Sequence, residues 1–392
     1  MSTVTFDVVR ASTKYVVDEN GDLSQVAANT PAFEYNADGT YKGMLVEEQR
    51  ENICLQSGDW SVSPWVAFTA GAGLTPVVTA DAGTAPDGTS NATRIQLDCD
   101  DDTVVANRSA WRQPITISNS TEYTVSFWYK AYDSSAIGDT VRVEHNNFAG
   151  AGLITITLTA DWQRYSFTGT SSGTSTSFLI ETKGGSTGQT ADILVWGAQF
   201  EAGDNASSYI PTTTTSVTRN ADEISKTSAS TYIGQTSGTV YIEAIIPKLK
   251  NRFVISISDG SALGEAIYLQ INPSLDLNVL IRTGGSTTTM SIADANWTAG
   301  LNKIAYTYEA GTDNSALFLN GASPITGTSA NIPTCNKIVL GARPDVAGGL
   351  SLNGWIRAVA LFTTRLSDAE AYSLTGYDTY AQMANALQYT IL

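Results

Sequence analysis

The sequence predicts an all-β protein: two antiparallel β-sandwiches of the jelly-roll type, preceded by an extended N-terminal arm and followed by a short C-terminal helix. The composition supports this class, because 17 Tyr and 8 Trp stand against 4 Met, and Thr, Val and Ile are frequent. Short segments of alternating apolar and polar residues recur between turns rich in Gly, Ser and Asp. The length of 392 residues suits two or three domains.

Charge and cysteine content exclude several classes of function. The net charge is −16, and the 22 basic residues are scattered, so neither nucleic acid nor anionic lipid is an expected partner. Cys54, Cys99 and Cys335 lie far apart, which argues against a disulfide framework or a structural zinc site and fits synthesis in a reducing cytoplasm. The sequence shows no signal peptide and no apolar run of membrane-spanning length, so we expect no membrane insertion.

Residues 1–56 are predicted to form the arm. Turn signals at 18–22, 29–31 and 36–40 separate short apolar pieces, none of which can bury much surface alone. The arm must therefore take its core from its own chain or from another subunit.

Residues 57–215 are predicted to form the first sandwich. The segment E-Y-T-V-S-F-W-Y-K alternates with period two, which is typical of a half-buried strand. This segment is at 122–130, and further strands of this kind are expected at 140–145, 153–159, 163–168, 177–182 and 193–201.

Residues 216–229 are predicted to link the two sandwiches. The preceding stretch Y-I-P-T-T-T-T-S-V-T-R-N-A-D-E-I has no helical period. Thr favours extended backbone and Pro211 extends Ile210, so the stretch is either a stiff connector or a strand that closes the first sandwich.

Residues 230–375 are predicted to form the second sandwich, and residues 376–392 a helical tail. Ser367 and Glu370 have the spacing of a capping box, which predicts a helix there, and a second helix is expected at 378–389. Strands are expected at 238–246, 253–258, 266–271, 277–282, 302–308, 316–321, 337–341 and 354–362.

Two separate blocks resemble proteins of tailed-phage virions. The first runs V-A-A-N-T-P-A-F-E-Y-N and then G-M-L-V-E-E-Q-R-E-N-I-C-L, and it is similar to a leading segment that many such proteins share. The second, V-W-G-A-Q-F-E-A-G-D-N-A-S-S-Y-I-P-T-T, resembles the end of their carbohydrate-binding-module-like jelly roll. Ala32, where an Arg is common, and Cys54, where an aliphatic residue is common, depart from the pattern.

The C-terminal region resembles the laminin-G/concanavalin-like lectin superfamily. The matching pieces are W-T-A-G-L-N-K-I-A-Y-T-Y, A-L-F-L-N-G, and L-N-G-W-I-R-A-V-A-L-F-T-T-R-L-S-D-A-E. Asn320-Gly321 is the hairpin dipeptide expected there. Together the resemblances imply a phage structural protein with sugar-binding-type folds, although a fold does not by itself determine function.

Sugar binding in such folds uses aromatic faces together with polar side chains that bind hydroxyl groups. The candidates are Trp60, Trp65, Trp111, Tyr129 and Tyr132. Other tryptophans lie in strand patterns or beside turns and are interpreted as structural.

A structural calcium ion is a second possibility. The stretch D-C-D-D-D-T carries four acids, which repel one another unless water or a cation compensates. A metal role for Asp98, Asp100, Asp101 and Asp102 is weighed against an ordinary solvated loop.

Catalysis is not expected. His145 is the single histidine, and no Gly-x-Ser-x-Gly motif accompanies it. No strand shows alternating acids of the E-x-D-x-E kind, and E-E-Q-R-E at 47–51 lies in the arm.

The sequence therefore predicts a virion structural protein on the outer surface of a phage particle, displaying its sandwiches for attachment to host-surface glycans. The alternative is a capsid decoration or fibre protein without strong glycan binding, and a glycan depolymerase is a weaker third hypothesis. Residues 1–56 are expected to bind other virion proteins by strand addition, and the chain to assemble as a trimer. Deletion of residues 1–50 is expected to leave soluble sandwiches that no longer enter particles.

Overall fold

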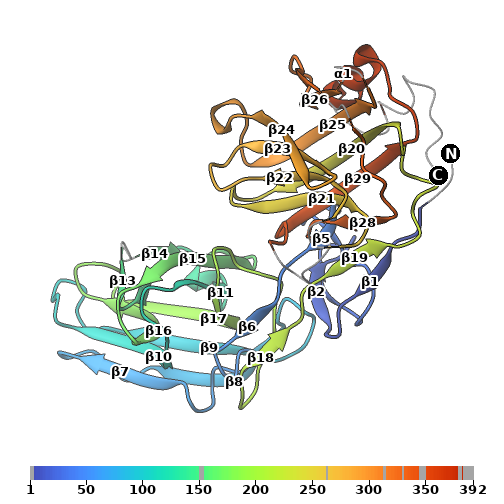
Figure 1. The fold of residues 1–392 in the computed structure, drawn as a ribbon. Coiled ribbons are helices and arrows are strands. Elements are labelled where there is room, and N and C mark those ends of the chain that lie inside the picture. The colour runs from blue at the N-terminus through green and yellow to red at the C-terminus, as the bar shows by residue number, and fades with distance from the viewer. Residues whose placement is uncertain are drawn as a thin grey trace.

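The computed structural model describes residues 4–149, 154–261, 264–311, 315–328, 331–343, 350–377 and 382. Figure 1 shows two β-sandwich lobes joined by the N-terminal strands and by the chain near β6 and β18. The all-β prediction is confirmed, because antiparallel sheets dominate and α1 (Asp368–Gly376) is a short helix near the C-terminus. No helix within the described residues is both long and apolar enough to cross a membrane.

The first sandwich packs a five-stranded sheet against a six-stranded sheet. The orders are β14-β12-β16-β10-β7 and β13-β15-β11-β17-β9-β8. Side chains that alternate inward from both sheets, such as Phe127 and Phe178, form its core. The strands are β7 (Val66–Ala70), β8 (Val77–Gly83), β9 (Ala92–Asp98), β10 (Arg108–Thr116), β11 (Glu122–Ala131), β12 (Thr140–His145), β13 (Phe148–Ala149), β14 (Ile154–Thr157), β15 (Gln163–Ser171), β16 (Ser175–Lys183) and β17 (Thr190–Ala202).

The second sandwich packs two seven-stranded sheets. Their orders are β1-β19-β28-β21-β22-β23-β24 and β27-β26-β25-β20-β29-β5-β4. Its core is aliphatic, rich in Ile, Val and Leu. The strands from the C-terminal half are β19 (Glu223–Lys226), β20 (Ser237–Ile246), β21 (Arg252–Ser258), β22 (Ala266–Ile271), β23 (Leu277–Thr283), β24 (Ser286–Ile292), β25 (Gly300–Glu309), β26 (Ser315–Leu319), β27 (Ile325–Gly327), β28 (Lys337–Leu340) and β29 (Gly354–Phe362).

The N-terminal segment buries its apolar side chains against other parts of the same chain. Two of its strands extend one sheet of the second sandwich, and a third pairs with β19 and forms the edge of the other sheet. Val46 is fully buried in the core of this sandwich. A separate hairpin, β2-β3, packs Tyr15 and Leu23 against aromatic residues of the first sandwich. The strands are β1 (Asp7–Val9), β2 (Lys14–Val17), β3 (Leu23–Val26), β4 (Phe33–Tyr35), β5 (Tyr41–Val46) and β6 (Arg50–Asn52).

The threonine-rich stretch after the first sandwich lies alongside residues 52–57. Tyr209 and Ile210 are buried, and Tyr209 Oη lies 2.8 Å from Ser57 Oγ. Thr212 donates its hydroxyl to the Cys54 carbonyl at 2.5 Å and its amide to Ser57 Oγ at 2.8 Å. The region 216–229, predicted to be a linker, contains β18 (Val217–Arg219), which pairs with β6, and β19.

The predicted capping box is present in full at the start of α1. Ser367 Oγ accepts from the Glu370 amide, and the Glu370 carboxylate accepts from the Ser367 amide. Asn320 and Gly321 both have positive φ, at 50° and 70°, as the hairpin dipeptide requires. The second helix expected at 378–389 lies, apart from Gln382, outside the described residues.

Candidate functional site

The two tryptophans predicted to contact sugar at 60 and 65 lie inside the first sandwich. Trp60 is 0% exposed and Trp65 is 3% exposed, and their rings stack with centroids 4.1 Å apart. The Trp60 Nε1–H donates to the Ser57 carbonyl at 3.1 Å. Since both rings lie in the core between the two sheets of the first sandwich, the structure assigns both residues to core packing.

The other three predicted aromatic residues do not form one binding face. Trp111 is half-buried against the core and donates its Nε1–H to the Trp60 carbonyl at 2.8 Å. Tyr129 also packs toward that core. Tyr132 lies on the opposite side of the six-stranded sheet, with the Arg94 guanidinium 3.7 Å from its ring centroid.

The acidic run at 98–102 does not converge on a point. Asp98 Oδ1 accepts from the Asp100 amide at 2.7 Å, and Asp101 Oδ1 accepts from the amide and hydroxyl of Thr103 at 2.8 and 2.6 Å. These are local turn contacts. Across the described residues, no three acidic, histidine or cysteine side chains are placed to hold a metal ion. The run therefore does not fit the predicted calcium site.

His145 is buried in the core of the first sandwich. Its ring stacks on Phe167 with centroids 5.1 Å apart and lies near Tyr165, whose hydroxyl is 3.5 Å from Nε2. Burial lowers the pKa of His145 to about 3, so the imidazole is neutral at ordinary pH.

A hollow of about 260 Å³ lies on the outer face of the second sandwich, over β21 to β24. Figure 1 shows the position of these strands in the second sandwich. Its floor is apolar: Phe253 and Tyr268 meet edge to face with centroids 5.3 Å apart, and Leu280 packs beside them. Its rim is polar. The lining consists of Phe253, Tyr268, Gln270, Leu280, Arg282, Thr287 and Arg343.

Strand periodicity places these residues on one face. On β22, Ile267 and Leu269 point into the core, so Tyr268 and Gln270 point outward. On β21 a register shift between Phe253 and Ile255 leaves Phe253 on the outer face.

The cross-strand register brings residues of the floor and of the rim of the hollow into pairs. Tyr268 is opposite Leu280, and on the neighbouring pair of strands Arg282 is opposite Thr287. Both charged residues in the lining are arginines, and none of the seven is acidic. Among the described residues Arg282 has no hydrogen-bond or ion-pair partner, so its guanidinium donors are directed to solvent.

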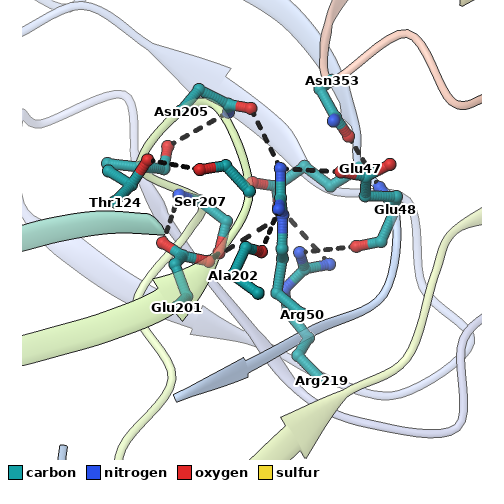
Figure 2. Close-up of polar contacts among 12 residues, drawn as sticks. Glu47, Glu48, Arg50, Thr124, Glu201, Ala202, Asn205, Ser207, Arg219 and Asn353 are labelled. Carbon is teal, nitrogen blue, oxygen red and sulfur yellow. Dashed lines mark hydrogen bonds and ion pairs between the residues drawn. The ribbon is translucent and has the colours of Figure 1, made fainter. Parts of the chain in front are cut away.

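A second polar cluster, the junction, is buried where the two sandwiches meet (Figure 2). Glu47 accepts from the amide and the hydroxyl of Ser208, both at 2.8 Å, and forms ion pairs with Lys14 at 3.0 Å and Arg219 at 3.5 Å. Burial acts to raise the pKa of Glu47, but Arg219 and Lys14 outweigh it and hold that pKa well below its usual range.

Arg50 is the centre of the junction in Figure 2. It forms an ion pair with Glu48 at 2.6 Å, contacts Asn205 Oδ1 at 3.2 Å and donates to the Ala202 carbonyl. A Cβ on Gly203, whose φ is 142°, would lie 1.1 Å from Arg50 Nη1, so only glycine leaves room for this guanidinium.

The second sandwich joins the junction through two more side chains. Asn353 Oδ1 accepts from the Glu48 amide at 2.8 Å, and Arg252 binds both Asp204 oxygens at 2.8 and 2.7 Å. The charged side chains of the junction are thus paired with one another, which indicates that the cluster holds the N-terminal segment and the two sandwiches together.

The two blocks that resemble virion proteins supply this junction. Glu47 and Arg50 come from the first block, and Ser207 and Ser208 from the second. The hollow, by contrast, was missed at the sequence level, although a signal existed. Assigning the alternate aliphatic residues of the two predicted strands at 266–271 and 277–282 to the core places Tyr268, Gln270 and Arg282 together on the other face.

No family model matches this chain, and no curated protein matches it. Among solved structures, it is similar to the CBM40 of the Ruminococcus gnavus IT-sialidase, with 20% identity over 38% of this chain and 88% of that one and a TM-score of 0.32. It is also similar to the SAP-like pentraxin of Limulus polyphemus, with 13% identity over 37% and 72% and a TM-score of 0.30. The botulinum neurotoxin serotype D binding domain matches with 12% identity over 38% of each chain and a TM-score of 0.29.

Proposed function

We propose that this chain is a phage virion protein that attaches the particle to host-surface glycans through the hollow over β21 to β24. The hollow carries the proposal. The floor of Phe253, Tyr268 and Leu280 is apolar and largely covered, since Phe253 and Tyr268 are each 6% exposed. The part of this floor that borders the hollow suits the C–H face of a sugar ring, and the polar rim suits its hydroxyl groups. The lining contains no carboxylate, thiol or imidazole, so we propose binding without catalysis.

The location on the outer surface of a virion is proposed from the two sequence blocks. Within the N-terminal segment, β4 is the last strand of its sheet. Phe33 in β4 is 49% exposed, and Tyr41 in the neighbouring strand β5 is 37% exposed. This aromatic edge is the part of residues 1–56 that we propose binds another virion protein by strand addition. The trimeric assembly remains a prediction.

Glycan binding is tested by changing Tyr268 to Leu. This substitution keeps an apolar side chain at the floor but removes the aromatic ring, so we expect at least about a tenfold loss of affinity for the glycans that the protein binds on a broad glycan array. Affinities are measured by biolayer interferometry, and thermal unfolding is followed for each variant.

The matched control is Tyr372→Leu, on the exposed side of α1, where the ring is 48% exposed. This control is expected to bind as the unchanged protein does. A folded Tyr268→Leu variant with unchanged affinity, or an array on which the unchanged protein binds no glycan, contradicts the proposed function.

A further inference from the structure

We infer that the hollow selects acidic glycans, and that the Arg282 guanidinium binds the sugar carboxylate. This inference rests on the proposed function and specifies its ligand class. The first observation is the local reversal of charge: the chain has 38 acidic and 22 basic residues, yet the lining of the hollow has two arginines and no acid. On an acidic protein, the positive charge of Arg282 in a lining without acids favours an anion at the hollow.

The second observation is that the Arg282 side chain has no hydrogen-bond or ion-pair partner in the part of the chain that the structure describes. Several other arginines are engaged with carboxylates: Arg94, for example, binds Asp192 with two hydrogen bonds of 2.8 and 2.5 Å. Arg282 has no such partner among the described residues. Its planar fork of donors matches a carboxylate in a two-point contact, which a neutral hydroxyl group cannot reproduce.

Two acids that flank β22 and β23, Glu265 and Asp276, are engaged in hydrogen bonds of their own. Glu265 precedes β22, and its Oε1 accepts from the Gly284 amide at 2.7 Å. Asp276, before β23, accepts from the Asp294 amide at 3.2 Å and from the Asn272 side-chain amide at 3.0 Å. Neither Glu265 nor Asp276 belongs to the lining of the hollow, so no carboxylate of the lining competes for the Arg282 guanidinium.

The rest of the lining fits a sugar ring that carries this carboxylate. Arg282 lies opposite Thr287, whose exposed hydroxyl stands beside it, while Leu280 is two residues away on the floor side. Gln270 supplies both a donor and an acceptor for ring hydroxyls. A volume of about 260 Å³ lies just below the roughly 300–1,000 Å³ typical of sites for drug-sized ligands, which suits one or two sugar residues.

The test uses matched pairs of glycans on one array: sialylated glycans with their desialylated forms, and uronate oligosaccharides with their carboxyl-reduced forms. Sulfated glycans form a separate arm that distinguishes sulfate from carboxylate. We expect the acidic member of at least one carboxylate pair to bind at least about tenfold more tightly than its neutral partner.

Three variants locate the effect. Arg282→Gln is expected to lose at least about tenfold in affinity for the acidic glycan, and Arg282→Lys to lose less, because it keeps the charge but not the fork. Thr287→Glu introduces a carboxylate at an exposed position on the rim of the hollow, and this variant is expected to lose binding of acidic glycans. The control Lys248→Gln changes net charge by the same single unit at a 48% exposed site outside the hollow, and is expected to bind within about twofold of the unchanged protein.

The outcomes separate the inference from the proposed function. Equal binding of acidic and neutral partners, preference for sulfate alone, or acidic binding that survives both Arg282→Gln and Thr287→Glu overturns the inference. If neutral binding is still lost in Tyr268→Leu, the proposed function stands without it. Absence of any glycan binding overturns both.

Discussion

At the scale of single residues, the buried charges explain why distant parts of the chain cannot separate. Asp222 is 1% exposed, and it accepts from Arg10 at 2.8 Å, from Lys14 at 2.6 Å and from the Glu47 amide at 2.9 Å. Breaking one such buried pair typically costs about 3–5 kcal/mol, because the remaining charge is left without a partner. That is a large share of the roughly 5–15 kcal/mol by which a domain is stable.

His145 is the residue that governs stability near neutral pH. Because its pKa is lowered on folding from 6.5 to about 3, the unfolded chain binds a proton that the folded chain does not as pH falls below the unfolded value. Its contribution is thus fully present above pH 6.5 and is lost as pH decreases. Burial raises the pKa values of Glu181 and Asp139, which changes stability in the opposite direction at lower pH.

We therefore expect the free energy of unfolding to fall by about 2 kcal/mol from His145 alone between pH 7 and pH 5. His145→Phe replaces the imidazole with another ring among Phe148, Phe167 and Phe178 and removes this term. Urea unfolding of both proteins at the two pH values measures the difference. An equal pH dependence in the two proteins would show that His145 is protonated without cost in the fold.

At the scale of elements, period-two patterns identified strands well but not their partners. All six strands predicted in the first sandwich are present in the described structure, and the capping box placed α1 correctly. Strands β7 to β10 were missed. V-A-F-T-A and V-V-T-A-D-A-G lack a regular alternation of polar residues, whereas β9 carries the alternating R-I-Q-L-D and could have been found. The pairing of β5 with β29 joins residues about three hundred positions apart, which no local pattern specifies.

The N-terminal strands lead to a revised expectation for a truncated chain. Deletion of residues 1–50 was expected to leave soluble sandwiches, but these residues supply β5, the fully buried Val46 and the partners of Asp222. We now expect such a chain to be insoluble or to lose cooperative unfolding of the second sandwich. Circular dichroism melts of the soluble fraction measure this.

A chain lacking residues 1–5 is the control for that deletion. It keeps β1, Arg10, Lys14 and every strand of the second sandwich, so its melting temperature is expected to remain close to that of the full chain. A soluble chain without residues 1–50 that melts cooperatively at the same temperature would contradict the role assigned to these strands.

At the scale of the whole molecule, the junction fixes the two sandwiches relative to each other. Burial acts to raise the pKa of Asp204, but Arg252 and Lys250 outweigh it and lower the pKa to about 2, so this carboxylate stays ionised against the second sandwich at ordinary pH. The sequence blocks that resemble virion proteins therefore correspond to an interdomain contact. A rigid connection of this kind fixes the direction of the outer face of β21 to β24 relative to the first sandwich.

The candidate site was the least predictable part. Aromatic residues can be found in a sequence, but whether a ring is buried depends on which strands pack over it. Trp60 and Trp65 come from a loop before β7, and nothing local shows that they fill the core between two sheets. Tyr268 and Arg282 come from strands that were predicted, and their common face follows only once the register between β22 and β23 is known.

The most direct test of glycan attachment through the hollow is a crystal structure of the protein soaked with the tightest-binding acidic glycan from the array. We predict sugar density over Phe253 and Tyr268, with the carboxylate in contact with the Arg282 guanidinium. Density on the first sandwich near Tyr132, or an empty hollow at a glycan concentration that saturates binding in solution, would contradict the account.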